Sequence, residues 1–489
     1  MIFSSFCPRF YKITPMRKLL LALLWLCATT TRANDLPAPV AQALKGAGIP
    51  VAATALWVGE VDAAKPRLAV NARAALNPAS TMKLVTTYAA LDLLGPAYVW
   101  KTEAFANGVL NDGVLTGDLH LRGGGDPKLT YDQFGRLLRQ IRARGIREIR
   151  GDLVLDRSAF AINGTDPARF DAQPMRPYNV APDALLVNFK AVTLQLIPDL
   201  ANRKLIVAME PAPANLDLIN QVTLVNGNGN GCGDWKEKLR ADTFSHGTTT
   251  RLVLTGVFPQ SCGEQRWNIA VMDHPQFVLG VFLQLWAELG GTLTGGVRDG
   301  TVPADARAVA VSPSPTLAEA VRDINKFSNN VMARQLFLTL GMEAGRRPAS
   351  ADDADAAIRS WLDARGLGIP ELVLENGSGL SRRERISAEG LGRVLQAAWR
   401  SSVMPELMAS LPVTATDGTM RKRLKQNGVA GQAHIKTGSL EGVRSIAGYV
   451  LDKTGRRWIV VFFVNHAHAG AAQPAQDALL EWVYAGRGT

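Results

Sequence analysis

Ser80-Thr81-Met82-Lys83 places a serine and a lysine three residues apart near the start of a predicted helix. Residues at this spacing lie on one helix face, so the Lys83 amine can reach the Ser80 hydroxyl. A serine hydroxyl is a weak nucleophile until a neighbouring base removes its proton. The backbone amide near a helix N-terminus can also face developing negative charge. This spacing often arises by chance, so it indicates acyl transfer only if other groups support it.

Two later motifs supply groups that such a site needs. Ser328-Asn329-Asn330 presents small polar side chains from a turn in a helical region, although most such triplets are turns or caps. Lys436-Thr437-Gly438-Ser439 lies on a predicted strand, where the lysine supplies positive charge and the hydroxyl groups can bind a carboxylate. Gly438 would let a substrate backbone lie close to the strand. S-x-x-K with K-T-G is the signature of β-lactamases and penicillin-binding proteins.

The elements that must position these motifs belong to two parts of the chain. Residues 34–100 and 304–489 show strands and amphipathic helices, whereas 101–303 shows short alternating strands between clusters of Gly, Asn and Pro. We expect an α/β (α+β) catalytic domain interrupted by a β-rich insert of one domain or two nested ones. The predicted strands are 54–58, 68–70, 433–436, 445–451 and 458–465, with 114–121, 153–155, 192–197, 204–209 and 251–258 in the insert; the predicted helices are 77–94, 317–340, 351–365 and 474–484.

Residues 1–33 are predicted to be a secretory signal peptide. Met16-Arg17-Lys18 is a short basic start, Leu19 to Ala28 is apolar, and Thr31-Arg32-Ala33 offers small residues for cleavage. The alternative is a buried N-terminal helix, and translation could start at Met1 or Met16. No later segment is long and apolar enough to form a transmembrane anchor. We expect a soluble protein that is periplasmic or otherwise extracytoplasmic.

The cysteines agree with export. Apart from two that leave with the signal, the chain keeps Cys232 and Cys262. An isolated pair in an oxidising compartment predicts a disulfide, and the alternative is two buried thiols.

The formal net charge of +11 favours loose association with an anionic wall polymer or membrane surface. No dense Lys/Arg block with interleaved aromatic residues occurs, so nucleic-acid binding is not expected. No metal or other cofactor is expected either, because His466-x-His468 lacks further ligands.

Beyond the three motifs, the chain resembles the class C low-molecular-mass penicillin-binding proteins, the D-alanyl-D-alanine carboxypeptidase/endopeptidase family. The resemblance covers nearly the whole mature chain, and the long separation between Ser80 and Ser328 leaves room for the insert. Two mild departures are Asn329 and Asn376, where Asp is common. The stretches that carry the resemblance are Asn77-Pro78-Ala79-Ser80-Thr81, Gly123-Gly124-Gly125-Asp126-Pro127, Tyr178-Asn179-Val180-Ala181-Pro182-Asp183-Ala184-Leu185, Asn376-Gly377-Ser378-Gly379-Leu380-Ser381-Arg382, Asp417-Gly418-Thr419-Met420 and Lys436-Thr437-Gly438-Ser439-Leu440.

The resemblance implies a penicillin-binding/β-lactamase-like transpeptidase fold, with an antiparallel sheet flanked by helices, and an acyl-enzyme reaction. Ser80 attacks the carbonyl between two D-alanines and releases the terminal one, and water then hydrolyses the acyl-enzyme. Lys83 must be neutral to act as the base. The fixed positive charge of Lys436 in a partly desolvated site is expected to lower the pKa of Lys83.

The resemblance also implies roles for the remaining groups. Ser328 relays the proton to the leaving amine, and Asn330 holds the substrate amide. Thr437 and Ser439 bind the terminal carboxylate beside Gly438. The oxyanion sits between the backbone amides of Ser80 and Ser439, where losing one such donor typically costs about 3–4 kcal/mol.

The insert is expected to shape peptide recognition without taking part in bond breaking. Asp171 is one candidate for meeting the amino group of a diamino acid. A β-lactamase would share the motifs but normally lacks so large an insert and needs a deacylating carboxylate that cannot be placed here. A non-catalytic penicillin-sensing or wall-binding module would not need Ser80, Lys83 and Lys436 together. The sequence therefore predicts a serine-type D-Ala-D-Ala carboxypeptidase/endopeptidase that acts on peptidoglycan stem peptides and is inhibited by β-lactams.

Overall fold

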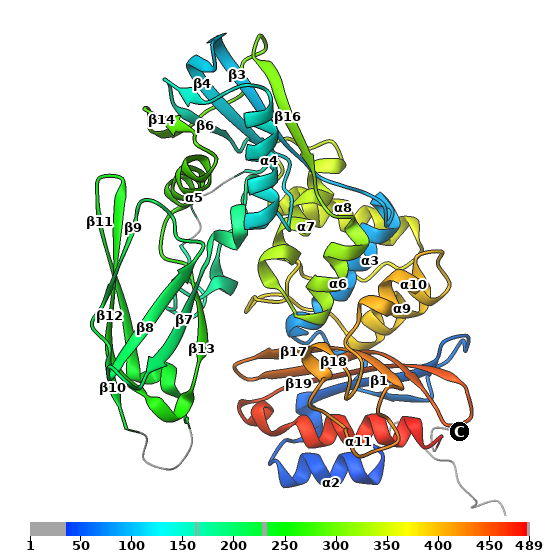
Figure 1. Ribbon diagram of the computed structural model, residues 1–489. Helices are drawn as coiled ribbons and strands as arrows, with labels where there is room; N and C mark the ends of the chain where they lie inside the picture. The colour runs from blue at the N-terminus through cyan, green and yellow to red at the C-terminus, as the bar shows by residue number, and fades with distance from the viewer. Residues whose placement is uncertain (1–35, 162–163, 165, 227–231, 487–489) are drawn as a thin grey trace, which may run out of the picture.

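A five-stranded antiparallel sheet lies at the centre of the domain that carries the three motifs. The computed structural model describes residues 36–161, 164, 166–226 and 232–486, so the predicted signal peptide lies outside the described residues. The sheet order is β17-β18-β19-β1-β2, which places the first strand beside the last (Figure 1). The strands are β1 (Thr54–Glu60), β2 (Leu68–Val70), β17 (Ala433–Leu440), β18 (Val443–Leu451) and β19 (Arg457–Asn465).

Helices cover both faces of this sheet. Successive residues of β19 point to opposite faces, so Val460 and Phe462 pack in one hydrophobic core and Val461 and Phe463 in another. One face is covered by α2 (Ala38–Gly46) and α11 (Gln473–Tyr484), below the sheet in Figure 1. The other is covered by the helical layer of α3 (Lys83–Leu94), α6 (Leu317–Lys326), α7 (Asn330–Glu343), α8 (Ala351–Ala364), α9 (Ala388–Trp399) and α10 (Met404–Ser410).

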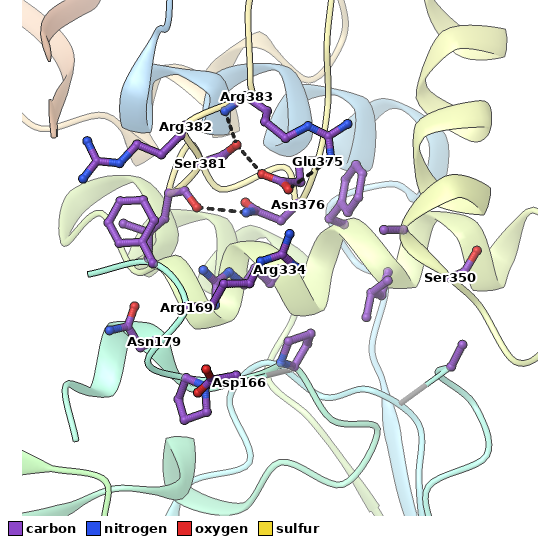
Figure 2. A pocket seen from close by; sticks show the side chains of 18 residues that line it. Asp166, Arg169, Asn179, Arg334, Ser350, Glu375, Asn376, Ser381, Arg382 and Arg383 are labelled. Atoms are coloured by element: carbon purple, nitrogen blue, oxygen red, sulfur yellow. Dashed lines mark hydrogen bonds and ion pairs between the residues drawn. The ribbon is translucent and has the colours of Figure 1, made fainter. Parts of the chain in front are cut away.

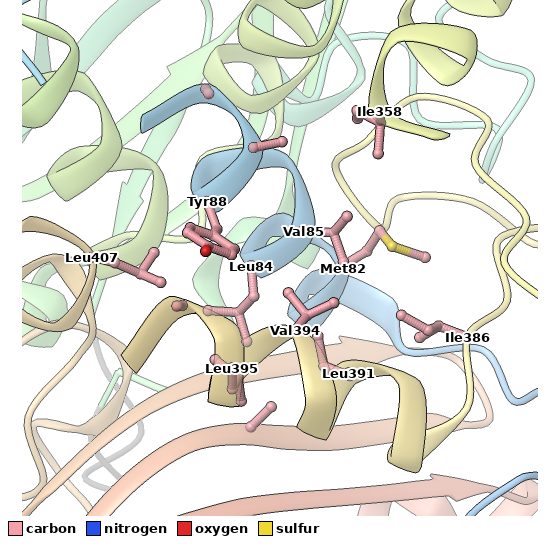
Figure 3. Packing of buried hydrophobic residues seen from close by; sticks show 14 of the residues in the cluster. Met82, Leu84, Val85, Tyr88, Ile358, Ile386, Leu391, Val394, Leu395 and Leu407 are labelled. Atoms are coloured by element: carbon pink, nitrogen blue, oxygen red, sulfur yellow. The ribbon is translucent and has the colours of Figure 1, made fainter. Parts of the chain in front are cut away.

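The helix that follows Ser80 is buried on all sides. Every residue of α3 from Lys83 to Leu91 is buried, as expected of a helix that is apolar around its whole circumference. Figure 3 shows Leu84 and Val85 of α3 facing Val394 and Leu395 of α9. This packing holds the start of α3 in a fixed position between the sheet and the other helices.

Both helices that carry motif residues differ from their predicted form. Ser80 lies on a 3-10 turn, η2 (Ala79–Met82), and α3 begins only at Lys83. The predicted helix 317–340 is two helices, because α6 ends at Lys326 and Ser328 takes a left-handed conformation with φ +57°. The Asn329 side chain then accepts a hydrogen bond from the Met332 amide at 3.1 Å and caps α7. The apolar period continues across the break, so periodicity alone could not reveal it.

The insert contains the expected strands, grouped in three further sheets among the described residues (Figure 1). One sheet packs against α4 (Tyr131–Ala143) and α5 (His274–Glu288). Its strands are β3 (Lys101–Asn111), β4 (Val114–Gly123), β5 (Glu148–Ile149), β6 (Leu153–Asp156), β14 (Thr292–Leu293), β15 (Val297–Asp299) and β16 (Arg307–Pro313). β16 lies after residue 303 and pairs with β3, so this sheet includes both ends of the insert.

The other two sheets of the insert lie farther from the helical layer (Figure 1). One consists of β7 (Val192–Asp199), β8 (Lys204–Glu210) and β13 (Gln265–Ile269), and the other of β9 (Leu216–Asn220), β10 (Thr223–Val225), β11 (Leu239–His246) and β12 (Thr249–Pro259). Cys232 and Cys262 form the predicted disulfide in this part of the insert. Over the described ranges, no helix combines the length and the apolar character needed to cross a membrane.

Candidate active site

The turn that carries Ser80 is tied to the sheet on either side. Asn77 and Asn465, at the end of β19, exchange two hydrogen bonds: the Asn77 amide donates to Asn465 Oδ1 at 2.9 Å and Asn465 Nδ2 donates to the Asn77 carbonyl at 3.0 Å. The Ser445 hydroxyl of β18 donates to the Pro78 carbonyl at 2.5 Å. These contacts fix the turn without using the Ser80 side chain, which is half-buried and points to Lys83.

Lys83 is the group closest to the predicted nucleophile. Its Nζ donates to Ser80 Oγ at 3.0 Å, to Asn330 Oδ1 at 2.5 Å and to the Ser378 carbonyl. A neutral amine keeps two N–H donors, enough for Asn330 and Ser378, and its lone pair can then accept the Ser80 proton. The geometry therefore suits Lys83 as a general base.

The pKa of Lys83 is lowered well below its usual value, as a neutral base requires. Complete burial of the amine is the largest cause, and the nearby charge of Lys436 comes second. The sequence had suggested the charge of Lys436 together with partial desolvation, without ranking the two. Burial dominates because the ammonium has lost its hydration at the centre of the helical layer, a property that two motifs read separately do not reveal.

Lys436 belongs to a second hydrogen-bonded pair. Its Nζ donates to Ser328 Oγ at 2.8 Å and to the Thr437 carbonyl at 2.8 Å. The sequence had suggested a fixed positive charge on Lys436. Burial lowers the pKa of Lys436 to about 7, so this charge is not permanent in the neutral range. The left-handed conformation of Ser328 turns its hydroxyl towards β17, on which Lys436 lies. The site thus contains one pair at Ser80 and Lys83 and another at Ser328 and Lys436.

Gly438 also has a structural reason within the fold itself. A Cβ atom at this position would lie 2.8 Å from the Pro78 carbonyl oxygen and 2.9 Å from the Ser80 amide nitrogen. Real Cβ atoms do not approach other atoms so closely. The glycine therefore lets β17 pack directly against the turn that carries the nucleophile.

Thr437 and Ser439 lie on the same face of β17, because side chains two residues apart along a strand point the same way. The Thr437 hydroxyl donates to Thr419 Oγ1 at 2.8 Å, and the Arg444 guanidinium donates to Ser439 Oγ. Ser439 is exposed and Thr437 is half-buried. Their hydroxyl groups and Arg444 form a polar edge that suits a carboxylate.

Sequence reasoning assigned no role to Ser378 and Gly379, although both lie in one of the stretches that carry the family resemblance. The Ser378 carbonyl accepts a hydrogen bond from Lys83. Gly379 has φ +77°, and a Cβ atom there would lie 2.7 Å from the Ser80 amide nitrogen. The Gly377-Ser378-Gly379 sequence could have pointed to them, because glycines often mark a place where two backbone segments approach closely. It does not tell which segment approaches.

Asp171 lies in the insert, apart from the two lysine pairs. Its two carboxylate oxygens accept hydrogen bonds of 2.7 Å from the Tyr178 hydroxyl and from Asn179 Nδ2. Partial burial opposes ionisation, but these hydrogen bonds lower the pKa of Asp171. The carboxylate is therefore charged at neutral pH and already holds two neighbours in place.

A cavity of about 420 Å³ separates this part of the insert from the catalytic domain. Figure 2 shows Asn179 on its insert side, Arg334 of α7 in the middle, and Asn376 and Ser381 on the other side. Phe170 also lines it, with the Arg382 guanidinium 5.2 Å from the centre of the Phe170 ring. Arg334, which lines the cavity, follows Asn330 by one turn of α7.

Comparison with known proteins identifies the family. The model of the D-Ala-D-Ala carboxypeptidase 3 (S13) family matches residues 36–485. The chain belongs to this family. The match confirms the predicted class, a serine-type D-Ala-D-Ala carboxypeptidase/endopeptidase that binds penicillin and acts on peptidoglycan.

Two relatives of the S13 chain align with it over most of their length. The D-alanyl-D-alanine carboxypeptidase DacB of Haemophilus influenzae is 26% identical over 394 residues, 80% of this chain and 81% of that protein. The D-alanyl-D-alanine carboxypeptidase of Actinomadura sp. (strain R39) is 30% identical over 428 residues, 83% of this chain and 76% of that protein. The crystal structure of penicillin binding protein 4 (dacB) from Haemophilus influenzae has a TM-score of 0.74 at 24% identity and covers 91% of this chain and 99% of its own. The predicted transpeptidase fold with a β-rich insert is thus confirmed.

Proposed function

We propose that this S13 peptidase cleaves the bond between the two terminal D-alanines of peptidoglycan stem peptides through an acyl-enzyme on Ser80. The observation that carries this proposal is the 3.0 Å hydrogen bond between Ser80 Oγ and the wholly buried amine of Lys83, whose pKa is lowered. Among the described residues no group of three or more His, Cys, Asp and Glu side chains could hold a metal ion. The side chains of the site supply a nucleophile and a base by themselves.

Acylation begins when neutral Lys83 accepts the Ser80 proton. The Ser80 oxygen bonds to the carbonyl carbon, and the resulting oxyanion is stabilised by the backbone amides of Ser80 and Ser439. The carbon–nitrogen bond then breaks, and the proton passes through Ser328 to the amine of the departing D-alanine. Water attacks the ester carbonyl in the second step, which frees Ser80 and returns the proton.

The terminal carboxylate of the substrate is proposed to bind along β17. Thr437 and Ser439 present hydroxyl groups on one face of the strand, and protonated Lys436 supplies the charge. A bound carboxylate favours the charged form of Lys436, so it raises a pKa that burial has lowered to about 7. Asn330 Oδ1 is occupied by Lys83, which leaves its Nδ2 as the donor for the substrate amide carbonyl.

The part of the peptide before the scissile bond is proposed to enter the cavity between α7 and the insert. Asn330 and Arg334 are on the same helix, one turn apart, while Lys436, Thr437 and Ser439 do not line the cavity. Asp171 contributes negative charge beside it, suited to the amino group of a diamino acid, and holds Asn179 at its wall. The insert thereby supplies recognition, and the groups that break the bond stay outside it.

Action on the wall places the protein outside the cytoplasm, in the periplasm or an equivalent compartment. The Cys232–Cys262 disulfide supports this location, because disulfides persist in oxidising compartments. β-Lactams are expected to acylate Ser80 as substrate analogues; a related structure, the Haemophilus influenzae penicillin binding protein 4, has been determined in complex with a β-lactam.

The proposed function is tested by incubating the purified protein with a stem pentapeptide and with cross-linked muropeptides, and measuring the masses of the products by mass spectrometry. Carboxypeptidase activity removes one terminal D-alanine, and endopeptidase activity separates the cross-linked halves. Either product, absent with Ser80→Ala, supports the proposal. Acylation by penicillin without either product would favour a sensor and contradict it.

A further inference from the structure

A buried carboxylate that the mechanism does not use lies close to Lys83. Glu384 is completely buried, and its Oε1 accepts hydrogen bonds from three successive backbone amides, those of Glu375 (3.2 Å), Asn376 (2.9 Å) and Gly377 (2.9 Å). Its Oε2 has no hydrogen-bond partner in the part of the chain that the structure describes. Burying a carboxylate costs free energy that its hydrogen bonds must offset, and here one oxygen makes none, so this position calls for an explanation.

The three amides belong to the loop that forms one wall of the Lys83 pocket. Directly after Gly377, the Ser378 carbonyl accepts a hydrogen bond from Lys83 Nζ. Gly379 then packs against the backbone of the Ser80 turn. Figure 2 shows this loop at Asn376 and Ser381, beside the cavity. By fixing the amides before Ser378, Glu384 fixes both the acceptor for Lys83 and the surface against which Ser80 lies.

The charges around Lys83 give Glu384 a second role. Lys436 from β17 and Arg334 from α7 both lower the pKa of Lys83, and Glu384 is the group that raises it. The Arg334 side chain is half-buried at the cavity wall and faces the charges of Glu384 and Glu375. The pocket therefore places two buried lysine amines and the Arg334 guanidinium around one wholly buried carboxylate, and burial raises the pKa of Glu384 itself.

We propose that Glu384 is a positioning residue for the acylation step, which holds the Ser378–Gly379 wall of the Lys83 pocket and supplies the counter-charge for its cations. This inference rests on the proposed function of Lys83 as the base. Without the negative charge, Lys83 loses its protons at lower pH. Without the backbone hydrogen bonds, the wall shifts and the Ser80–Lys83 geometry is lost.

The test compares Glu384→Gln with Glu375→Gln by measuring penicillin acylation rates across pH. The glutamine carbonyl at 384 can still accept backbone hydrogen bonds, but the negative charge that raises the pKa of Lys83 is gone. The acidic limb of the pH–rate profile for acylation therefore moves to lower pH. Glu375 pairs with Arg383 at 3.5 Å and accepts a hydrogen bond from the Ser381 hydroxyl, and it is not among the groups that shift the pKa of Lys83. Its variant keeps the limb at the wild-type position. An unmoved limb in Glu384→Gln, or the same shift in both variants, overturns the counter-charge role.

Glu384→Asp separates geometry from charge. It keeps the carboxylate but shortens its reach, so the acidic limb stays near the wild-type position while the plateau rate falls roughly 10- to 100-fold, the usual cost of small displacements at a reacting centre. A folded Glu384→Asp with the wild-type plateau rate overturns the positioning role. If the wild-type protein itself is not acylated, the proposed function fails before either variant is considered.

Discussion

Replacing Gly438 by alanine tests whether the contact between β17 and the Ser80 turn sets the geometry of the nucleophile. The new methyl group would lie 2.8 Å from the Pro78 oxygen and 2.9 Å from the Ser80 nitrogen. The methyl group would also collide with the Ser445 hydroxyl, which must turn away and give up its hydrogen bond to the Pro78 carbonyl. Since van der Waals separations are about 3.5 Å or more, the strand and the turn must also move apart by roughly 0.5 Å or more. Overpacking of this kind costs about 1–3 kcal/mol of stability. A displacement of that size at the reacting atom should lower the acylation rate about 10- to 100-fold.

The assay measures acylation by a chromogenic penicillin and thermal unfolding of the same samples. Gly46→Ala is the control, because a Cβ atom at Gly46 would meet nothing within 4 Å. We expect Gly438→Ala to unfold at a lower temperature and to acylate slowly, while Gly46→Ala retains the wild-type rate. A folded Gly438→Ala that acylates as fast as the wild type would show that the contact does not set the position of Ser80.

Three further outcomes follow from the site and the insert. In Lys436→Gln, loss of a cation that lowers the pKa of Lys83 raises that pKa, so the acidic limb of the acylation profile moves to higher pH; an unmoved limb would remove Lys436 from the control of the base. Cys262→Ser opens a loop of 30 residues and should destabilise the insert by about 3–4 kcal/mol, measured by calorimetry; an unchanged unfolding profile would contradict this. Asp171→Asn should lower turnover of stem peptides that carry a free diamino acid about tenfold more than it lowers penicillin acylation, as expected when a remote binding contact is lost. Equal losses on both substrates would argue against a recognition role for Asp171.

The local parts of the site could be predicted from the sequence, because short spacings determine them. Ser80 and Lys83 are three positions apart, and this spacing brings the two side chains together even though the first turn is 3-10 and not α-helical. The strand predicted over 433–436 likewise forms, as the first half of β17. The break at Ser328 was hidden because the apolar period continues on both sides of it.

The non-local parts could not be predicted in the same way. The Ser378 carbonyl reaches Lys83 across 295 positions, and no spacing rule connects a backbone oxygen to a lysine so far away. Burial of the two lysines depends on the helical layer and the sheet closing around them, and this burial dominates the pKa of each. Gly438 was recognised from its motif, but the sequence could not show that β17 packs against the Ser80 turn and leaves no room there for a side chain.

The most direct test of the central claim is the intact mass of the protein after incubation with penicillin. The account predicts a gain of one drug adduct, located on the peptide that contains Ser80, and no gain in a folded Ser80→Ala variant. An adduct that persists in Ser80→Ala, or a wild-type protein that gains none, would contradict the assignment of Ser80 as the nucleophile.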